Sequence, residues 1–203
     1  MINFSDLIWT TENALTDEFC EHVINKFEER VDDQEDGVTG SGYVPNVKQS
    51  KDIHLSSYDA WKPEDDVFYK SLNKHFNIYR EHLGPNTYCE LAKDCNDVGY
   101  QLQRTEPGQF YTWHHDSIPY YFDGQLKQRA VTFIWYLNDV DEGGYTEFID
   151  GTKIQPERGR ILFFPATWTY MHRGFPPKSN TKYICTGWMY TDYSDFSGKH
   201  GLD

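Results

Sequence analysis

The sequence predicts a mainly β protein of the α+β class: a double-stranded β-helix, or jelly roll, with N-terminal supporting helices. Two segments with helical periodicity come first, and about eight short strand-like segments separated by Pro, Gly, Asp and Asn follow. An aromatic content of 17% suits a β-rich core. We therefore predict a single domain over residues 1–203, in which 1–95 hold helices, edge strands and a loop, 96–192 form the jelly roll, and 193–203 form a tail.

The first predicted helix follows Leu15. Thr16 can cap its free N–H groups, and Asp17 and Glu18 suit the positive end of the helix dipole. Apolar residues then recur at helical spacing. We expect this helix to pack against the core.

The second predicted helix spans residues 64–83 and ends at Gly84-Pro85. An edge strand is expected at residues 7–9. The acidic and Gly-rich stretch 28–46 indicates a mobile surface loop, and residues 47–55 resemble an imperfect strand.

The second half of the chain contains the strands of the predicted jelly roll. They are expected at residues 98–104, 110–116, 129–137, 145–149, 153–155, 160–164, 168–172 and 182–190.

Charge and cysteine content limit the possible partners and the location. The formal net charge is -13, so a nucleic-acid backbone would be repelled. Cys89 and Cys95 could form a loop disulfide, but ordinary thiols in a reducing compartment fit the irregular cysteine spacing better. No apolar run resembles a signal peptide or a membrane span. We expect a cytoplasmic protein without nucleic-acid or membrane partners.

A histidine and an aspartate lie two residues apart in the strand predicted after Pro107-Gly108. Strand alternation puts His114 and Asp116 on one face with Thr112, and Tyr111, Trp113 and His115 on the other. His-x-Asp is one arm of the two-histidine, one-carboxylate triad that holds non-heme Fe(II). A surface histidine near an aspartate is also common, so the interpretation depends on ligands downstream.

Two downstream residues complete this hypothesis. His172 ends the strand predicted at 168–172 and precedes a turn, so its ring can face a cavity. Lys182 opens the next strand. A lysine there normally points into water, but an inward-facing ammonium group would suit a carboxylate ligand.

These residues belong to a longer series of motifs whose order and spacing are specific. The series comprises His114-x-Asp116, the segment from Arg129 to Asp139, Glu142-Gly143-Gly144-Tyr145-Thr146-Glu147-Phe148, Pro156 and Gly159 before Ile161-Leu162-Phe163-Phe164-Pro165, and then His172, Lys182 and Trp188. From about Gly99 to Tyr190 the chain resembles the catalytic domain of the prolyl 4-hydroxylase family of Fe(II)/2-oxoglutarate-dependent dioxygenases.

The resemblance implies a role for each matching residue. His114, Asp116 and His172 would ligate Fe(II), and Lys182 would pair with the distal carboxylate of 2-oxoglutarate. Tyr111 and Thr146 would donate hydrogen bonds near that carboxylate. Arg129 would lie near the substrate, and Trp188 would be an aromatic residue that borders the pocket. The chain departs from the family at Thr105, where a tyrosine is usual, and at Tyr145, where a glutamate is usual.

The implied reaction converts 2-oxoglutarate and dioxygen to succinate and carbon dioxide and hydroxylates a C–H bond, with ascorbate an open candidate cofactor. The expected substrate is a prolyl residue in a peptide or protein. The same chemistry on a free amino acid or other small metabolite stays open, as does a catalytically silent binding module. Candidate lids are residues 37–46 and 117–124, and His115 is expected in the core or bonded to a ligand.

Overall fold

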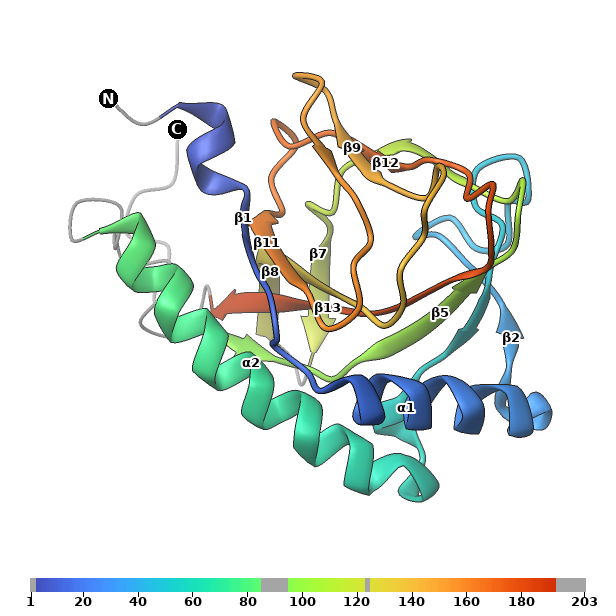
Figure 1. Ribbon diagram of the computed structural model, residues 1–203. Coiled ribbons are helices and arrows are strands. Elements are labelled where there is room, and N and C mark those ends of the chain that lie inside the picture. The colour runs from blue at the N-terminus through green and yellow to red at the C-terminus, as the bar shows by residue number, and fades with distance from the viewer. Residues whose placement is uncertain (1–2, 85–94, 123–124, 193–203) are drawn as a thin grey trace.

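The computed structural model describes residues 3–84, 95–122 and 125–192. Two antiparallel β-sheets lie opposite one another, and two helices cover the outer face of the larger sheet (Figure 1). This arrangement confirms the predicted jelly roll. The Cys89–Cys95 pairing and the predicted tail involve residues outside the described ranges. In the described part of the chain, neither helix has the length and hydrophobicity needed to span a bilayer.

The larger sheet has nine strands, all in antiparallel pairs. Along its main path the order is β1 (Trp9–Thr11), β11 (Ile161–Pro165), β8 (Gln125–Tyr136), β13 (Lys182–Asp192), β5 (Gln101–Thr105), β3 (Lys51–Ile53) and β2 (Glu35–Asp36). In addition, β7 (Pro119–Phe122) pairs with β8, and β4 (Asn96–Asp97) pairs with β13.

The smaller sheet has four strands. Their order is β10 (Lys153–Ile154), β9 (Thr146–Phe148), β12 (His172–Gly174) and β6 (Tyr111–His114). Its strands are short because glycine turns interrupt this region, with positive φ at Gly143, Gly144 and Gly151.

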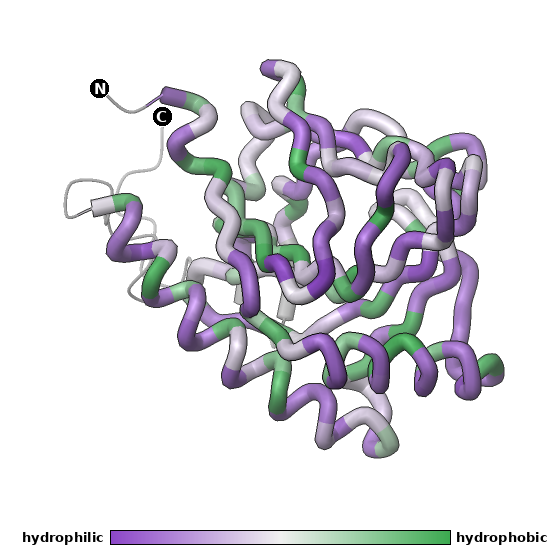
Figure 2. The backbone as a smooth tube through the Cα atoms, in the orientation of Figure 1, coloured by the Kyte–Doolittle hydropathy of each residue, from purple (hydrophilic) through white to green (hydrophobic). Residues whose placement is uncertain are grey.

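The predicted helices are α1 (Asp17–Glu29) and α2 (Lys62–Leu83). Thr16 caps α1 by accepting a hydrogen bond from the Phe19 N–H, and Gly84, with φ of 73°, ends α2. Both helices alternate hydrophobic and hydrophilic residues along their length (Figure 2). Short 3-10 helices lie at Phe4–Leu7, Val31–Asp33, Leu55–Ser57 and Asp59–Trp61.

Alternation along β8 divides the hydrophobic core into two layers. Phe133 and Trp135 pack with the helices, whereas Ile134 and Tyr136 point into the space between the sheets. Successive residues of β8 therefore contribute to different layers of the core. The pocket described below lies in the layer between the two sheets.

The segment between Val47 and Ile53 joins the two sheets at one edge. The Thr112 N–H of β6 donates to the Val47 carbonyl, and the Gln49 N–H donates to the Phe110 carbonyl. From Lys51 onward the same segment pairs with β5 of the larger sheet. The predicted strand at 47–55 is therefore regular only over β3, and its first half closes the gap between the sheets.

Two predicted elements differ from the structure. The strand expected at 168–172 is wrong: a turn from Thr167 to Tyr170 leaves Trp168 exposed, and His172 begins β12 instead of ending a strand. The candidate lid at 117–124 stays a prediction, and in its described part β7 is hydrogen-bonded to β8. The edge strand expected at 7–9 begins at Trp9, because a 3-10 helix occupies the residues before it.

Candidate active site

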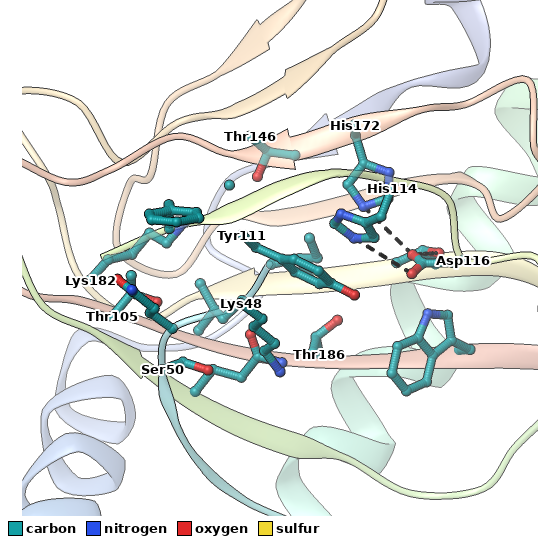
Figure 3. Close-up of a pocket in the computed structure, with 18 residues that line it drawn as sticks. Lys48, Ser50, Thr105, Tyr111, His114, Asp116, Thr146, His172, Lys182 and Thr186 are labelled. Atoms are coloured by element: carbon teal, nitrogen blue, oxygen red, sulfur yellow. Dashed lines mark hydrogen bonds and ion pairs between the residues drawn. The ribbon is translucent and has the colours of Figure 1, made fainter. Parts of the chain in front are cut away.

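A pocket lies between the two sheets (Figure 3). Residues from both sheets line it, together with residues of the segment 47–53 that joins the sheets, called the crossing segment below. In this view His114, Asp116 and His172 lie at one end, and Lys182 and Thr105 lie at the other, with Tyr111 between them. The pocket thus brings together residues that are far apart in the sequence.

Two histidines and one aspartate form the metal-site candidate. His114 at the end of β6 is opposite His172 at the start of β12 in the strand register, and Asp116 follows two residues after β6. His114 Nε2 lies 3.8 Å from Asp116 Oδ1, and His172 Nε2 lies 3.7 Å from Asp116 Oδ2. Each residue offers a ligand atom within 4.8 Å of the others, in the one such group found among the described residues.

Backbone carbonyls orient both imidazole rings. His114 Nδ1 donates to the Thr112 carbonyl at 2.8 Å, and His172 Nδ1 donates to the Tyr170 carbonyl at 3.0 Å. Since Nδ1 carries the proton, each Nε2 presents its lone pair toward the aspartate. Burial lowers the pKa of His114, and the adjacent His172 lowers it further, so the ring favours its neutral, ligating form.

The carboxylate of Asp116 is held in its charged form. Burial opposes ionisation, but His172 and His114 outweigh it and keep the pKa of Asp116 below its ordinary value. Thr132 on β8 donates a hydrogen bond to Oδ2 at 2.7 Å. Two imidazole nitrogens and one carboxylate fit the donor set that non-heme Fe(II) takes, with coordination positions left over.

Tyr111 lies on the same side as His114, contrary to the strand alternation expected from the sequence. Its ring stacks on the imidazole of His114, with centroids 3.6 Å apart and planes 13° apart. On the neighbouring strand β12, His172 pairs with His114 and Gly174 pairs with Tyr111. These partners are two residues apart on β12 but three residues apart on β6, so β6 contains one extra residue. This bulge shifts the alternation by one residue and turns Tyr111 into the pocket.

Lys182 extends into the pocket from the start of β13. Its side chain is 5% exposed, and its ammonium group donates to the Gly144 carbonyl at 3.0 Å. No carboxylate of the described residues lies within ion-pair distance of it, and burial alone lowers the pKa of Lys182 to about 8. A buried cation without a counter-ion fits an anionic group of a bound molecule.

Of the remaining predicted site residues, Thr146 and Trp188 line the pocket, whereas Arg129 does not line it and contacts Trp188. Thr146 is buried, with its hydroxyl 2.7 Å from that of Tyr136. Arg129 stacks on Trp188, with Cζ 3.5 Å from the ring centroid. The indole N–H of Trp188 is buried and has no acceptor among the described residues. This stack and the free donor form one wall beside the metal-site candidate.

His115 and Thr105 are two further residues for which the sequence analysis made specific expectations. His115 is exposed, so its expected place in the core or in contact with a ligand is wrong. Thr105 is buried, lines the pocket and is paired with Lys182 across β5 and β13.

The sequence analysis missed a buried polar group on the opposite wall. Lys48, Ser50 and Asp52 all point inward from the crossing segment, and Gln101 bonds to Asp52. They occupy every second position of the segment, but Gln49 and Lys51 between them are polar as well. The sequence therefore contains no alternation that marks one of the two sides as buried.

The pocket between the sheets combines two histidines and a carboxylate with a buried lysine that has no counter-ion among the described residues. These are the groups that a metal ion and an anionic co-substrate require. Comparison with known proteins narrows this class of site. Residues 100–190 match the family model described as the 2OG-Fe(II) oxygenase superfamily. Over these residues the chain is similar to this superfamily, in agreement with the prolyl 4-hydroxylase-like motifs of its sequence.

Two named relatives and one solved structure are also similar to this chain. The chain is 29% identical to probable prolyl 4-hydroxylase 9 of Arabidopsis thaliana over 44% of its length, and 26% identical to prolyl 4-hydroxylase 1 of the same plant over 93%. It spans 40% of the first relative and 70% of the second. A Trichoplax adhaerens prolyl hydroxylase, solved with a hypoxia-inducible factor peptide, matches 92% of this chain at 18% identity, with a TM-score of 0.68 and 84% of its own chain covered. At this identity the structural match supports the fold alone.

Proposed function

We propose that this protein is an Fe(II)- and 2-oxoglutarate-dependent dioxygenase that hydroxylates a prolyl residue in a peptide or protein. One observation carries the proposal: the ligand atoms of His114, Asp116 and His172 lie within 4.8 Å of one another in the pocket that also holds Lys182, which has no carboxylate partner among the described residues. A metal-chelating dicarboxylate requires both features.

Each group has a distinct task. The three ligand residues would hold the iron, which supplies oxidative chemistry coupled to decarboxylation of the co-substrate. Lys182 would bind the distal carboxylate, and the stacked ring of Tyr111 restricts the orientation of His114.

The substrate proposal rests on the wall formed by Arg129 and Trp188. A guanidinium group and an indole N–H can donate to peptide carbonyl oxygens, and the flat indole suits contact with a pyrrolidine ring. The relatives' names and the peptide bound to the Trichoplax protein support the same choice.

The test combines the protein with Fe(II), 2-oxoglutarate and dioxygen in the presence of a panel of proline-containing peptides. We expect a peptide mass gain of one oxygen atom and a matching yield of succinate, with His172→Ala as the inactive control. Succinate release with small metabolites but with no peptide would favour the alternative substrate class. No succinate at full metal occupancy would indicate a silent binding module.

Two sequence-based expectations stay predictions. Ascorbate is proposed as a reductant that sustains turnover, which omission of ascorbate from the same assay would test. A cytoplasmic location is proposed as well, and fractionation of cells that express the protein would test it.

A further inference from the structure

Two lysines line the same pocket. Lys182 enters from β13 and Lys48 from the crossing segment, and their side chains are 5% and 4% exposed. If the protein uses 2-oxoglutarate as proposed above, the dianion meets two buried ammonium groups. The question is which of the two lysines binds the carboxylate of 2-oxoglutarate that does not contact the metal.

The two lysines differ in their partners. Lys182 donates to a neutral carbonyl oxygen, that of Gly144. Lys48 instead forms an ion pair with Asp52, with Nζ 2.6 Å from Oδ2 and the aspartate 2% exposed. Lys48 thus already has a counter-ion inside the protein, whereas Lys182 has none among the described residues.

Further hydrogen bonds fix the position of Asp52. Ser50 donates to Oδ1 at 2.7 Å, and the side-chain amide of Gln101 donates to Oδ2 at 2.9 Å. Gly37 covers the pair from outside: a Cβ atom there would be 2.2 Å from Ser50 Oγ and 3.1 Å from Asp52 Oδ2. Because it is enclosed and bonded through both oxygens, Asp52 cannot turn away from Lys48 without leaving buried donors unsatisfied.

Lys48 lies close enough to the metal-site candidate to compete for a ligand. Its ammonium group is 5.6 Å from the centroid of the Tyr111 ring, which stacks on His114. Figure 3 places Lys48 and Ser50 along a different part of the wall from Lys182 and Thr105. A carboxylate drawn to Lys48 would therefore take a different orientation from one anchored at Lys182.

We propose that Asp52 is a specificity-determining residue: it neutralises Lys48 and thereby leaves Lys182 as the single anchor for the dicarboxylate. A buried ammonium without a partner is strongly unfavourable, so Lys48 without Asp52 recruits an anion from solution. With Asp52 present, the wall at Lys48 is polar but has no net charge. The same wall then suits the neutral backbone of a peptide.

The test uses glutarate, which resembles the co-substrate but lacks its keto group, and metal-free protein studied by calorimetric titration. In a Lys182→Met background the ordinary anchor is absent. Adding Asp52→Asn should make glutarate bind about tenfold tighter or more, the effect of one charge-assisted hydrogen bond. The further change Lys48→Met should abolish this gain, and Ser50→Ala in place of Asp52→Asn serves as the matched control without a charge change. An Asp52→Asn variant that folds but binds no tighter overturns the proposal.

A second arm covers the case in which Asp52→Asn does not fold. Lys48→Met with Lys182 intact leaves the carboxylate of Asp52 uncompensated and should weaken glutarate binding about fivefold or more through repulsion. Unchanged affinity in Lys48→Met also overturns the proposal. If the wild-type protein does not bind glutarate, or if Lys182→Met has no effect on that binding, the co-substrate assignment itself fails, which separates the two failures.

Discussion

Thr132 donates a 2.7 Å hydrogen bond to Oδ2 of Asp116, the same oxygen that lies 3.7 Å from His172 Nε2. Thr132 belongs to β8 of the larger sheet, whereas His172 belongs to β12 of the smaller one. The position of one carboxylate therefore depends on both sheets.

The first prediction concerns this hydrogen bond. Thr132→Val keeps the shape of the side chain but removes the donor, so the carboxylate is free to rotate. We expect the affinity for Mn(II) or Fe(II) to fall about 10- to 100-fold, as is usual when a partner of a metal ligand is lost. The affinity for Mn(II) is measured by titration followed by electron paramagnetic resonance. Thr186→Val is the control, because the Thr186 hydroxyl in the same pocket donates to the Phe133 carbonyl.

The second prediction concerns His172. The centroid of its ring lies 4.7 Å from the ring centroid of Phe164 and 5.8 Å from that of Phe148. His172→Ala should abolish metal binding and turnover while the protein stays folded, because the ring contributes one ligand but only part of this packing. Circular dichroism melting and metal titration together test this. His115→Ala, an exposed histidine next to the site, should change neither. Global unfolding of His172→Ala would show that the ring is chiefly a core residue.

Local patterns predicted much of the scaffold. The Thr16 cap gives the start of α1, Gly84 gives the end of α2, and apolar runs give the long central strands β8 and β13. Each of these signals acts within a few residues. The His-x-Asp spacing also brings the two side chains together in the structure, because His114 ends β6 and Asp116 follows two residues later.

Other features depend on contacts that a local pattern does not contain. The bulge opposite Gly174 turns Tyr111 toward His114, although simple alternation separates them. Asp52 is buried because the segment that carries it crosses from one sheet to the other. Tertiary pairing decides both outcomes, so period-two reasoning alone gives the wrong face.

The third prediction follows from the depressed pKa of Lys182. Burial lowers this pKa to about 8, so the free protein loses the ammonium charge as pH rises above that value. Binding a carboxylate then requires proton uptake, and the affinity for 2-oxoglutarate should fall about tenfold per pH unit above pH 8 and stay nearly constant below it. Anaerobic calorimetry on Mn(II)-loaded protein from pH 6.5 to 9.5 measures the profile. Lys182→Met should bind weakly with no such inflection, and the same inflection in that variant would refute the assignment.

The fourth prediction concerns the stack of Arg129 on Trp188. Arg129→Lys keeps the charge but loses the planar guanidinium that lies 3.5 Å from the ring centroid. We expect the KM for a peptide substrate to rise about tenfold, the effect of one lost charged hydrogen bond. The Kd for 2-oxoglutarate and the rate of succinate formation without peptide should stay unchanged. A shift in those two quantities, with an unaltered peptide KM, would place Arg129 at the co-substrate instead.

The last prediction concerns Glu64, which is 4% exposed and joins α2 to α1. Its Oε1 lies 2.7 Å from His22 Nε2, and its Oε2 accepts a 2.7 Å hydrogen bond from Lys26. Burial acts to raise the pKa of Glu64, but these two partners outweigh it and the pKa is lowered from its ordinary value of 4.5. The stabilisation is therefore complete above pH 4.5 and is lost as pH falls through the lower pKa of the folded state.

Glu64→Gln removes this charge and should lower the free energy of unfolding at pH 7 by about 2 kcal/mol, because a buried partner of Lys26 is lost. The difference from the wild-type protein should shrink as pH falls from 4.5 toward 3, since the wild-type carboxylate is then protonated as well. Urea unfolding at a series of pH values measures both effects. Asp66→Asn is the matched control: its pair with Lys62 on the same helix is exposed and 3.4 Å long, so the cost should be below about 0.5 kcal/mol. If both variants lose the same free energy of unfolding, the buried ion pair of Glu64 with Lys26 contributes no more to stability than an exposed pair.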